Sequence, residues 1–108
     1  MYRQGDILIQ PVPEDSVPAA VHGLPRAPRD GRGRLILALG EATGHAHAVV
    51  GSGVLLCDPE PLAPDHLHLP SGGRVVHEEH AAISLPAGWY RVVRQREYFP
   101  GAVRVVAD

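Results

Sequence analysis

The histidines of this chain gather in clusters whose spacing suits chemistry. His45 and His47 stand one residue apart in GEATGHAHAVV, and a second cluster, HEEH, runs from His77 to His80. Because side chains of a strand alternate between its faces, we expect His45 and His47 to point the same way. Imidazole is the commonest metal ligand in proteins, and two on one strand can hold one ion. The sequence therefore predicts a metal site, provided that the segments carrying the two clusters are neighbours.

The second cluster offers both imidazoles and carboxylates. In an extended HEEH segment, His77 shares a face with Glu79, and Glu78 shares one with His80. A strand that stops near residue 79 would also let His80 join His77. Three histidines and a carboxylate would form a site for a divalent transition metal, Zn, Fe, Mn or Ni. The predicted metal ligands are His45, His47, His77, Glu79 and His80, and the same side chains together with Arg94 are the predicted catalytic residues.

The histidines also have a simpler interpretation. Alternation alone produces HxH pairs on half-exposed strands, where polar outward positions are expected. His66 and His68 form such a pair in HLHLP, a segment equally typical of an ordinary half-buried edge strand. We therefore treat His66 and His68 as a second choice behind the other two clusters.

The segment WYRVVRQREYF, residues 89–99, is the longest predicted strand. Alternation puts Arg94 and Arg96 on one face, and neither face is purely apolar. This pattern is typical of an edge or interface strand, whose charges prevent edge-to-edge aggregation. It would also suit an anion held between Arg94 and Arg96, or a single-stranded nucleic-acid groove that combines stacking with phosphate contacts. If either arginine points towards His45, an anionic substrate is predicted.

Glycine and proline divide the rest of the chain into short pieces rich in Val, Ile and Leu, which is typical of an all-β domain. The Pro-rich segment 13–33 is predicted to be a long loop, and no helix is expected. Glycine-containing hairpin turns are expected at 51–53, 71–73, 86–88 and 100–102. Strands are expected at 5–12, 34–39, 44–50, 54–58, 66–69, 74–79, 82–85, 89–99 and 103–107. Eight or nine short strands in residues 1–108 predict one small β-barrel or jelly roll.

Composition narrows the class of protein. With 108 residues, 44% of them apolar, and no apolar run near the length of a membrane span, the chain is expected to be one globular domain that is not membrane-bound. The net charge of −2 gives no general reason to expect DNA binding. A single cysteine, Cys57, fits a reducing cytosol.

The basic residues are all arginine, and together with abundant Ala, Gly and Pro they favour a GC-rich bacterial genome. We therefore expect a bacterial, cytoplasmic protein without a signal peptide. Its few aromatic residues make a thin core, which favours a homodimer.

The order of TGHAHAVV, LPSGGRVVHEEH and ISLPAGWYRV resembles the cupin superfamily of small metal-binding jelly rolls. The resemblance implies a metal held by three His and a Glu, with His45 and His47 as the first pair and His77 as the later ligand. The glutamate expected soon after HxH is missing, because AVVGSG follows, so Glu78 or Glu79 would take its place. GEATGHAH, HEEH and RQREY together also resemble a small bacterial family without an assigned function. The opening GDILIQPVPED is similar to the start of chaperonin co-factor subunits.

Three functions follow from these patterns. The first is a cupin-like metal-binding protein. As a small metalloenzyme, it would use the metal to activate water or a small oxygen-bearing substrate. The second is a metal-independent nuclease or phosphodiesterase acting on RNA or nucleotides, in which two histidines serve as general base and acid and Arg94 or Arg96 stabilises a phosphorane-like charge. The third is a non-enzymatic binding or assembly module.

Overall fold

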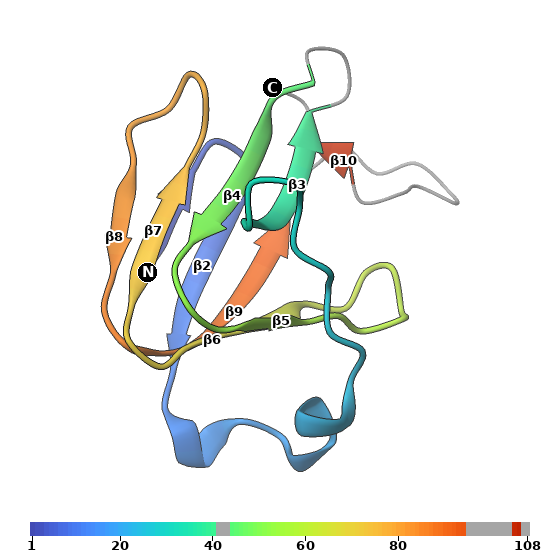
Figure 1. The fold of residues 1–108 in the computed structure, drawn as a ribbon. Helices are drawn as coiled ribbons and strands as arrows, with labels where there is room; N and C mark the ends of the chain where they lie inside the picture. Colours follow the sequence, from blue (N-terminus) through green and yellow to red (C-terminus); the bar gives the residue numbers. More distant parts are fainter. Residues whose placement is uncertain (41–43, 95–104, 107–108) are drawn as a thin grey trace.

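The computed structural model describes residues 1–40, 44–94 and the backbone of 105–106, and it is all-β. Two five-stranded sheets lie in separate layers (Figure 1). The first sheet has the order β1 (Tyr2–Gln4), β2 (Ile7–Val12), β9 (Gly88–Arg94), β6 (Asp65–Leu69) and β5 (Val54–Leu56). The second sheet has the order β10 (Val105–Val106), β3 (Leu35–Gly40), β4 (Ala46–Val50), β7 (Gly73–Val76) and β8 (Ile83–Leu85).

The predicted all-β class is therefore confirmed. Neighbouring strands pair antiparallel, except for β10 and β3, which are parallel. Across the described ranges no strand of one sheet pairs with a strand of the other, so a closed barrel is not found. The same ranges contain no α-helix, only the 3-10 turns η1 (Glu14–Ser16) and η2 (Ala19–Gly23). No helix in the described part of the chain has the length and apolar character needed to cross a membrane.

The glycine-rich segments serve a different purpose from the predicted one. Residues 51–53, 71–73 and 86–88 were predicted to be hairpin turns, but each lies where the chain crosses from one sheet to the other. Their glycines let backbones approach closely: a Cβ on Gly53 would lie 2.0 Å from the His68 carbonyl oxygen, and one on Gly51 would lie 2.8 Å from that of Gly72. The hairpins are instead β1–β2, β3–β4, β5–β6 and β7–β8. The predicted turn at 100–102 lies outside the described residues.

Two strands predicted at an edge are internal. β9 lies between β2 and β6, and β6 lies between β9 and β5 (Figure 1). The prediction failed because β1, which was not foreseen, extends the sheet beyond β2, and because β5 pairs along β6. The alternation predicted for residues 89–94 holds: Tyr90 and Val92 belong to the core between the sheets.

Apolar side chains from both sheets fill the layer between them. The buried members are Ile7, Ile9, Leu35, Leu37, Ala38, Val49, Leu55, Leu67, Leu69, Val75, Leu85, Tyr90 and Val92. Burial of such surface is the main term that stabilises a domain of this size. Cys57 is half-buried and packs against this core.

The predicted long loop packs onto the outer face of the first sheet. Val17 and Val21 from its 3-10 turns form a second apolar cluster with Trp89 and Leu56. Further along, the Ala27 N–H donates to the Leu55 carbonyl oxygen at 2.8 Å, which attaches the segment to β5. The first sheet is therefore covered by apolar contacts on both faces, and residues 13–27 are part of the packed structure.

Candidate functional site: a histidine cluster

Strand pairing in the second sheet brings the two predicted histidine clusters together. β4 and β7 are neighbouring strands (Figure 1), with Val76 paired to Ala48, and extending this register by one residue sets His77 opposite His47. The ring centroids of His47 and His77 are 4.3 Å apart. His45 lies just before β4, and its ring centroid is 5.5 Å from that of His77.

The HEEH segment is not extended, because β7 ends at Val76. The face alternation predicted for residues 77–80 therefore does not apply. The chain turns instead, and the ring of His80 lies 4.6 Å from that of His77 and 5.8 Å from that of His47. The contact of His80 with His77, predicted for a strand that stops early, is thus found. Four imidazoles from two segments form one histidine cluster: His45, His47, His77 and His80.

Gln4 sets the protonation pattern of the most buried ring. Its Nε2 donates to the carbonyl oxygens of Val75 at 3.2 Å and Ala81 at 2.9 Å, so its Oε1 is the atom that faces His47 at 2.9 Å. An amide oxygen only accepts hydrogen bonds, and therefore Nδ1 of His47 must carry the proton. The lone pair of the neutral ring is then on Nε2. A hydrogen bond that holds the far nitrogen in this way suits an imidazole that acts as a metal ligand or as a general base.

His77 has the opposite tautomer. Its Nδ1 accepts a hydrogen bond of 3.0 Å from the backbone N–H of Glu79, so the proton of the neutral ring is on Nε2. This Nε2 is buried, and within the described residues it has no hydrogen-bond partner. In this arrangement His77 offers a donor to the cluster rather than a lone pair.

Two carboxylates, those of Glu78 and Glu79, lie beside the cluster and contact different groups. Glu79 Oε1 is 3.4 Å from Nδ1 of His45, which keeps the predicted carboxylate near the predicted ligands. Glu78 instead accepts from the Ala46 N–H, at 3.1 and 3.2 Å from its two oxygens. Partial desolvation raises the pKa of the Glu78 carboxyl, but the Ala46 hydrogen bond and the nearby histidines outweigh it and lower the pKa from its ordinary value. Glu78 thus joins the start of β4 to the HEEH segment.

The turn between β1 and β2 borders the cluster at Gly5. A Cβ at this position would lie 3.0 Å from Nε2 of His80 and 3.4 Å from Nε2 of His47. The two Nε2 atoms therefore face the same small region of space, next to a residue with no side chain. Gly5 also has a φ of +56°, which favours glycine.

These donors match a transition-metal site in part. Imidazole nitrogens with one carboxylate are suitable ligands for Zn, Fe, Mn or Ni. Yet within the described ranges, no three His, Cys, Asp or Glu side chains are arranged around one point as ligands. His77 would have to give up its bond to the Glu79 N–H before its ring could bind a metal through Nε2. The exposed side chains of Glu79 and His80 would have to turn towards His47.

Arg94 was predicted to be a catalytic residue that contacts an anion, but the structure pairs it with groups inside the fold. It lies in the layer between the sheets, where Nη2 contacts the Asp65 carboxylate at 2.8 Å and Nε donates to the Leu37 carbonyl oxygen at 2.6 Å. Its charge is therefore neutralised by a buried partner. Arg96, the other predicted anion contact, lies outside the described residues.

His66 and His68 take no part in the histidine cluster. They point to the outer face of the first sheet, as the alternation with Leu67 and Leu69 predicted. The ring of His68 stacks on Trp89 at 4.3 Å.

Sequence reasoning missed Gln4, Gly5 and the hydrogen bond of Glu78. A Gly-Asp pair is one of the two-residue combinations found in hairpin loops, and Gly5-Asp6 could have revealed the turn before the apolar run of β2. No sequence pattern indicates which glutamine will be buried beside a histidine.

The described residues thus form an all-β protein of two packed sheets with a histidine cluster at the ends of β4 and β7. A family model described as a domain of unknown function (DUF8820) matches residues 3–95. The chain belongs to this family, and the matched segment includes both histidine-bearing segments. A search of curated proteins and a search of solved structures each gave no match.

Proposed function

We propose that this is a cupin-like metal-binding protein whose ligands come from the histidine cluster. The observation that carries the proposal is the hydrogen bond between Gln4 and His47. It orients a buried ring, 1% exposed, so that Nε2 presents its lone pair to the region that Nε2 of His80 also faces. A carboxylate or carbonyl behind a ligating histidine is the usual support of such a ligand.

The remaining ligands are proposed from the same cluster. His45 and Glu79 lie within 3.4 Å of each other, and His77 contacts the rings of all three other histidines. His47 is the fixed ligand, and the exposed His80 and Glu79 are able to change rotamer at small cost. A bound transition metal would supply Lewis acidity, which activates water or a small oxygen-bearing substrate.

Metal content of untagged protein tests the proposal. We expect about one equivalent of a transition metal in the parent protein, or after incubation with Zn²⁺, Fe²⁺, Mn²⁺ or Ni²⁺ followed by desalting. The variant His45→Ala/His80→Ala should lose this metal while remaining folded, because neither residue belongs to the core. The matched control is His66→Ala/His68→Ala, which removes another pair of histidines from the opposite face of the molecule. Absence of metal in the parent under all four ions, or equal loss in both variants, would refute the proposal.

A second function is favoured by the opposite tautomers of His47 and His77. The lone pair on Nε2 of His47 suits a general base, and the proton on Nε2 of His77 suits a general acid. The ring centroids are 4.3 Å apart, so both groups could act on one phosphodiester of RNA or of a nucleotide. Arg94 would not stabilise the charge of the transition state, because Asp65 holds its guanidinium.

Cleavage of RNA in the presence of a chelator separates the two functions. The acid–base mechanism predicts activity that survives chelation, has a bell-shaped pH profile and disappears in His77→Ala. Activity that is lost on chelation and regained with one particular metal would favour the metal-binding function instead. No cleavage under either condition would leave metal binding without nuclease activity as the function of the cluster.

A further inference from the structure

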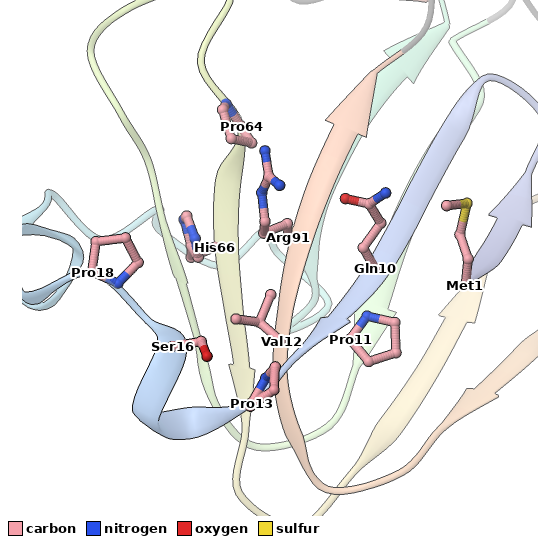
Figure 2. A pocket seen from close by; sticks show the side chains of 10 residues that line it. All are labelled: Met1, Gln10, Pro11, Val12, Pro13, Ser16, Pro18, Pro64, His66 and Arg91. Carbon is pink, nitrogen blue, oxygen red and sulfur yellow. The ribbon is translucent and has the colours of Figure 1, made fainter.

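The outer face of the first sheet carries a second candidate site that the histidine cluster does not share. A cavity of about 670 Å³ opens there, beside the segment that covers Trp89. Figure 2 shows the side chains that line it, with Arg91 between His66 and Gln10. The cavity is of the size that holds a small organic molecule.

Strand register places the polar side chains of the cavity in one row. Arg91 of β9 pairs with Gln10 of β2 on one side and with His66 of β6 on the other. Residues paired across neighbouring strands project to the same face of a sheet. One guanidinium, one imidazole and one amide therefore face the cavity side by side (Figure 2).

His66 is a buried residue with a ring nitrogen that lacks a hydrogen-bond partner in the described part of the fold. Its residue is 6% exposed, and Nδ1 has no hydrogen-bond partner among the described residues. Burial and the neighbouring Arg91 lower the pKa of His66, against the weaker opposing effects of Asp65 and Asp58, so the ring is neutral at pH 7. Burying a ring nitrogen without a partner is unfavourable, and in the tautomer that carries the proton on Nδ1 the ring can donate to an oxygen of a ligand.

Arg91 supplies a positive charge to the same cavity. It is exposed, and within the described ranges it forms no ion pair with Asp or Glu. A guanidinium presents several N–H donors in one plane and binds carboxylate or phosphate with two parallel hydrogen bonds. Arg91 and His66 together are thus suited to the two oxygens of one anion.

Apart from the polar row, most of the lining of the cavity is apolar. Pro11, Pro13, Pro18 and Pro64 lie around the row, together with Val12 (Figure 2). Proline has no backbone N–H to satisfy and a fixed φ, so these residues offer rigid apolar surface on which a flat ring can pack. In the next row of the sheet, Trp89 is covered by Val17.

We propose that this cavity binds a small organic anion that carries a flat ring. Its carboxylate or phosphate contacts Arg91 and Nδ1 of His66, Gln10 contacts a polar atom beside it, and its ring packs against the prolines. The nucleoside monophosphates and the aromatic carboxylates share this chemistry. The site is independent of the proposed metal site, because the two lie on opposite faces of the first sheet.

Chemical-shift titrations of the whole chain test the proposal with four probes. AMP and indole-3-acetate combine an anion with a flat ring, whereas inorganic phosphate and acetate provide the anion alone. We expect saturable shifts at Gln10, His66 and Arg91 with AMP, with indole-3-acetate, or with both, and the pattern identifies the source of the anion. Equal affinity for the ring-free probes, or no shift with any probe, would overturn the proposal.

Substitutions separate a built site from general charge attraction. Arg91→Gln and His66→Leu are each expected to weaken binding roughly tenfold, since each removes a contact to the anion. Arg74→Gln is the matched control, because it removes an exposed arginine from β7 of the second sheet. Equal weakening in Arg74→Gln would show that binding follows net charge, and this too would overturn the proposal. If His66→Leu does not fold, Arg91→Gln alone decides, because its side chain is exposed.

Discussion

Gln4 Oε1 accepts a hydrogen bond from Nδ1 of His47, and the two atoms are 2.9 Å apart although the residues are separated by 43 positions in the chain. The amide of Gln4 is itself oriented by the carbonyl oxygens of Val75 and Ala81. One buried side chain thus connects the β1–β2 hairpin, β4 and the segment after β7. The orientation of His47 depends on this connection.

The first prediction concerns Gln4. Gln4→Leu leaves the Nδ1 proton of His47 and two carbonyl oxygens without their partner. We expect the free energy of unfolding to fall by about 3 kcal/mol, and metal affinity to fall roughly tenfold, as for other residues that support a ligand. Urea unfolding and metal titration measure the two effects. Gln10→Leu on the outer face of β2 is the control, and its effects on the free energy of unfolding and on metal affinity should both be much smaller. Losses as large as those of Gln4→Leu would contradict the role of Gln4.

The second prediction uses a pair of glycines with similar backbones. Gly5 has a φ of +56° and Gly33 a φ of +75°, so an alanine at either position has about 1 kcal/mol of backbone strain. Only at Gly5 would the new Cβ meet imidazoles, at 3.0 Å from His80 and 3.2 Å from His47; at Gly33 nothing lies within 4 Å. We expect Gly5→Ala to weaken metal binding and Gly33→Ala to leave it unchanged. Calorimetric titration of both variants distinguishes local crowding from loss of stability, and equal affinities would contradict the proposed position of the metal.

The third prediction concerns the ion pair between Arg94 and Asp65, whose side chains are 9% and 1% exposed. Arg94→Met leaves a buried carboxylate without its main partner, and we expect a loss of about 3–5 kcal/mol in the free energy of unfolding. Arg94→Met/Asp65→Leu removes both charges and should recover much of this loss. A double variant less stable than Arg94→Met would show that Asp65 has another essential partner. Denaturant unfolding of the parent chain, Arg94→Met, Asp65→Leu and the double variant completes the cycle.

The fourth prediction concerns pH. The pKa of His66 is lowered from 6.5 in the folded chain, mainly by burial and by Arg91. Between the folded pKa and 6.5, the unfolded chain therefore binds more protons than the folded chain. Stability should therefore decline as the pH falls below about 6.5 and should level off below the folded pKa. His66→Gln should make the slope of unfolding free energy against pH smaller between pH 7 and 5. His68→Gln is the control, and an unchanged slope in His66→Gln would contradict the assignment.

The sequence was sufficient for the class of fold and for the choice of the two histidine segments, whereas their meeting in space was a condition that only the structure could test. Alternating apolar residues define strands locally, and His45, His47, His77 and His80 were singled out on spacing alone. The strand order was not predictable, because pairing depends on contacts between residues far apart in the chain. Gly51 and Gly53 illustrate the difficulty: glycine is needed both in a hairpin turn and where two backbones approach, and the sequence does not distinguish the two.

The roles of the charged residues were the least predictable part. Two predictions rested on the charged residues within one strand: that Arg94 contacts an anion, and that β9 lies at the edge of its sheet. The structure buries Arg94 against Asp65, a partner 29 positions away, and makes β9 central. Buried charges become recognisable only when their partners are known. Arg91, three residues earlier, is the arginine that faces a cavity.

The contacts of Gln4 also bear on the order in which the chain folds. Its hydrogen bonds reach across 43, 71 and 77 residues, and its hairpin pairs through β2 with the central strand β9, which comes late in the chain. Loops of such length close slowly, because their entropy is lost before the contacts form. A nascent chain that ends at residue 80 would therefore contain Gln4 and all four histidines, but not the Ala81 carbonyl oxygen that helps to orient the Gln4 amide. The cluster would acquire its arrangement only late in synthesis, after the strands around it have paired.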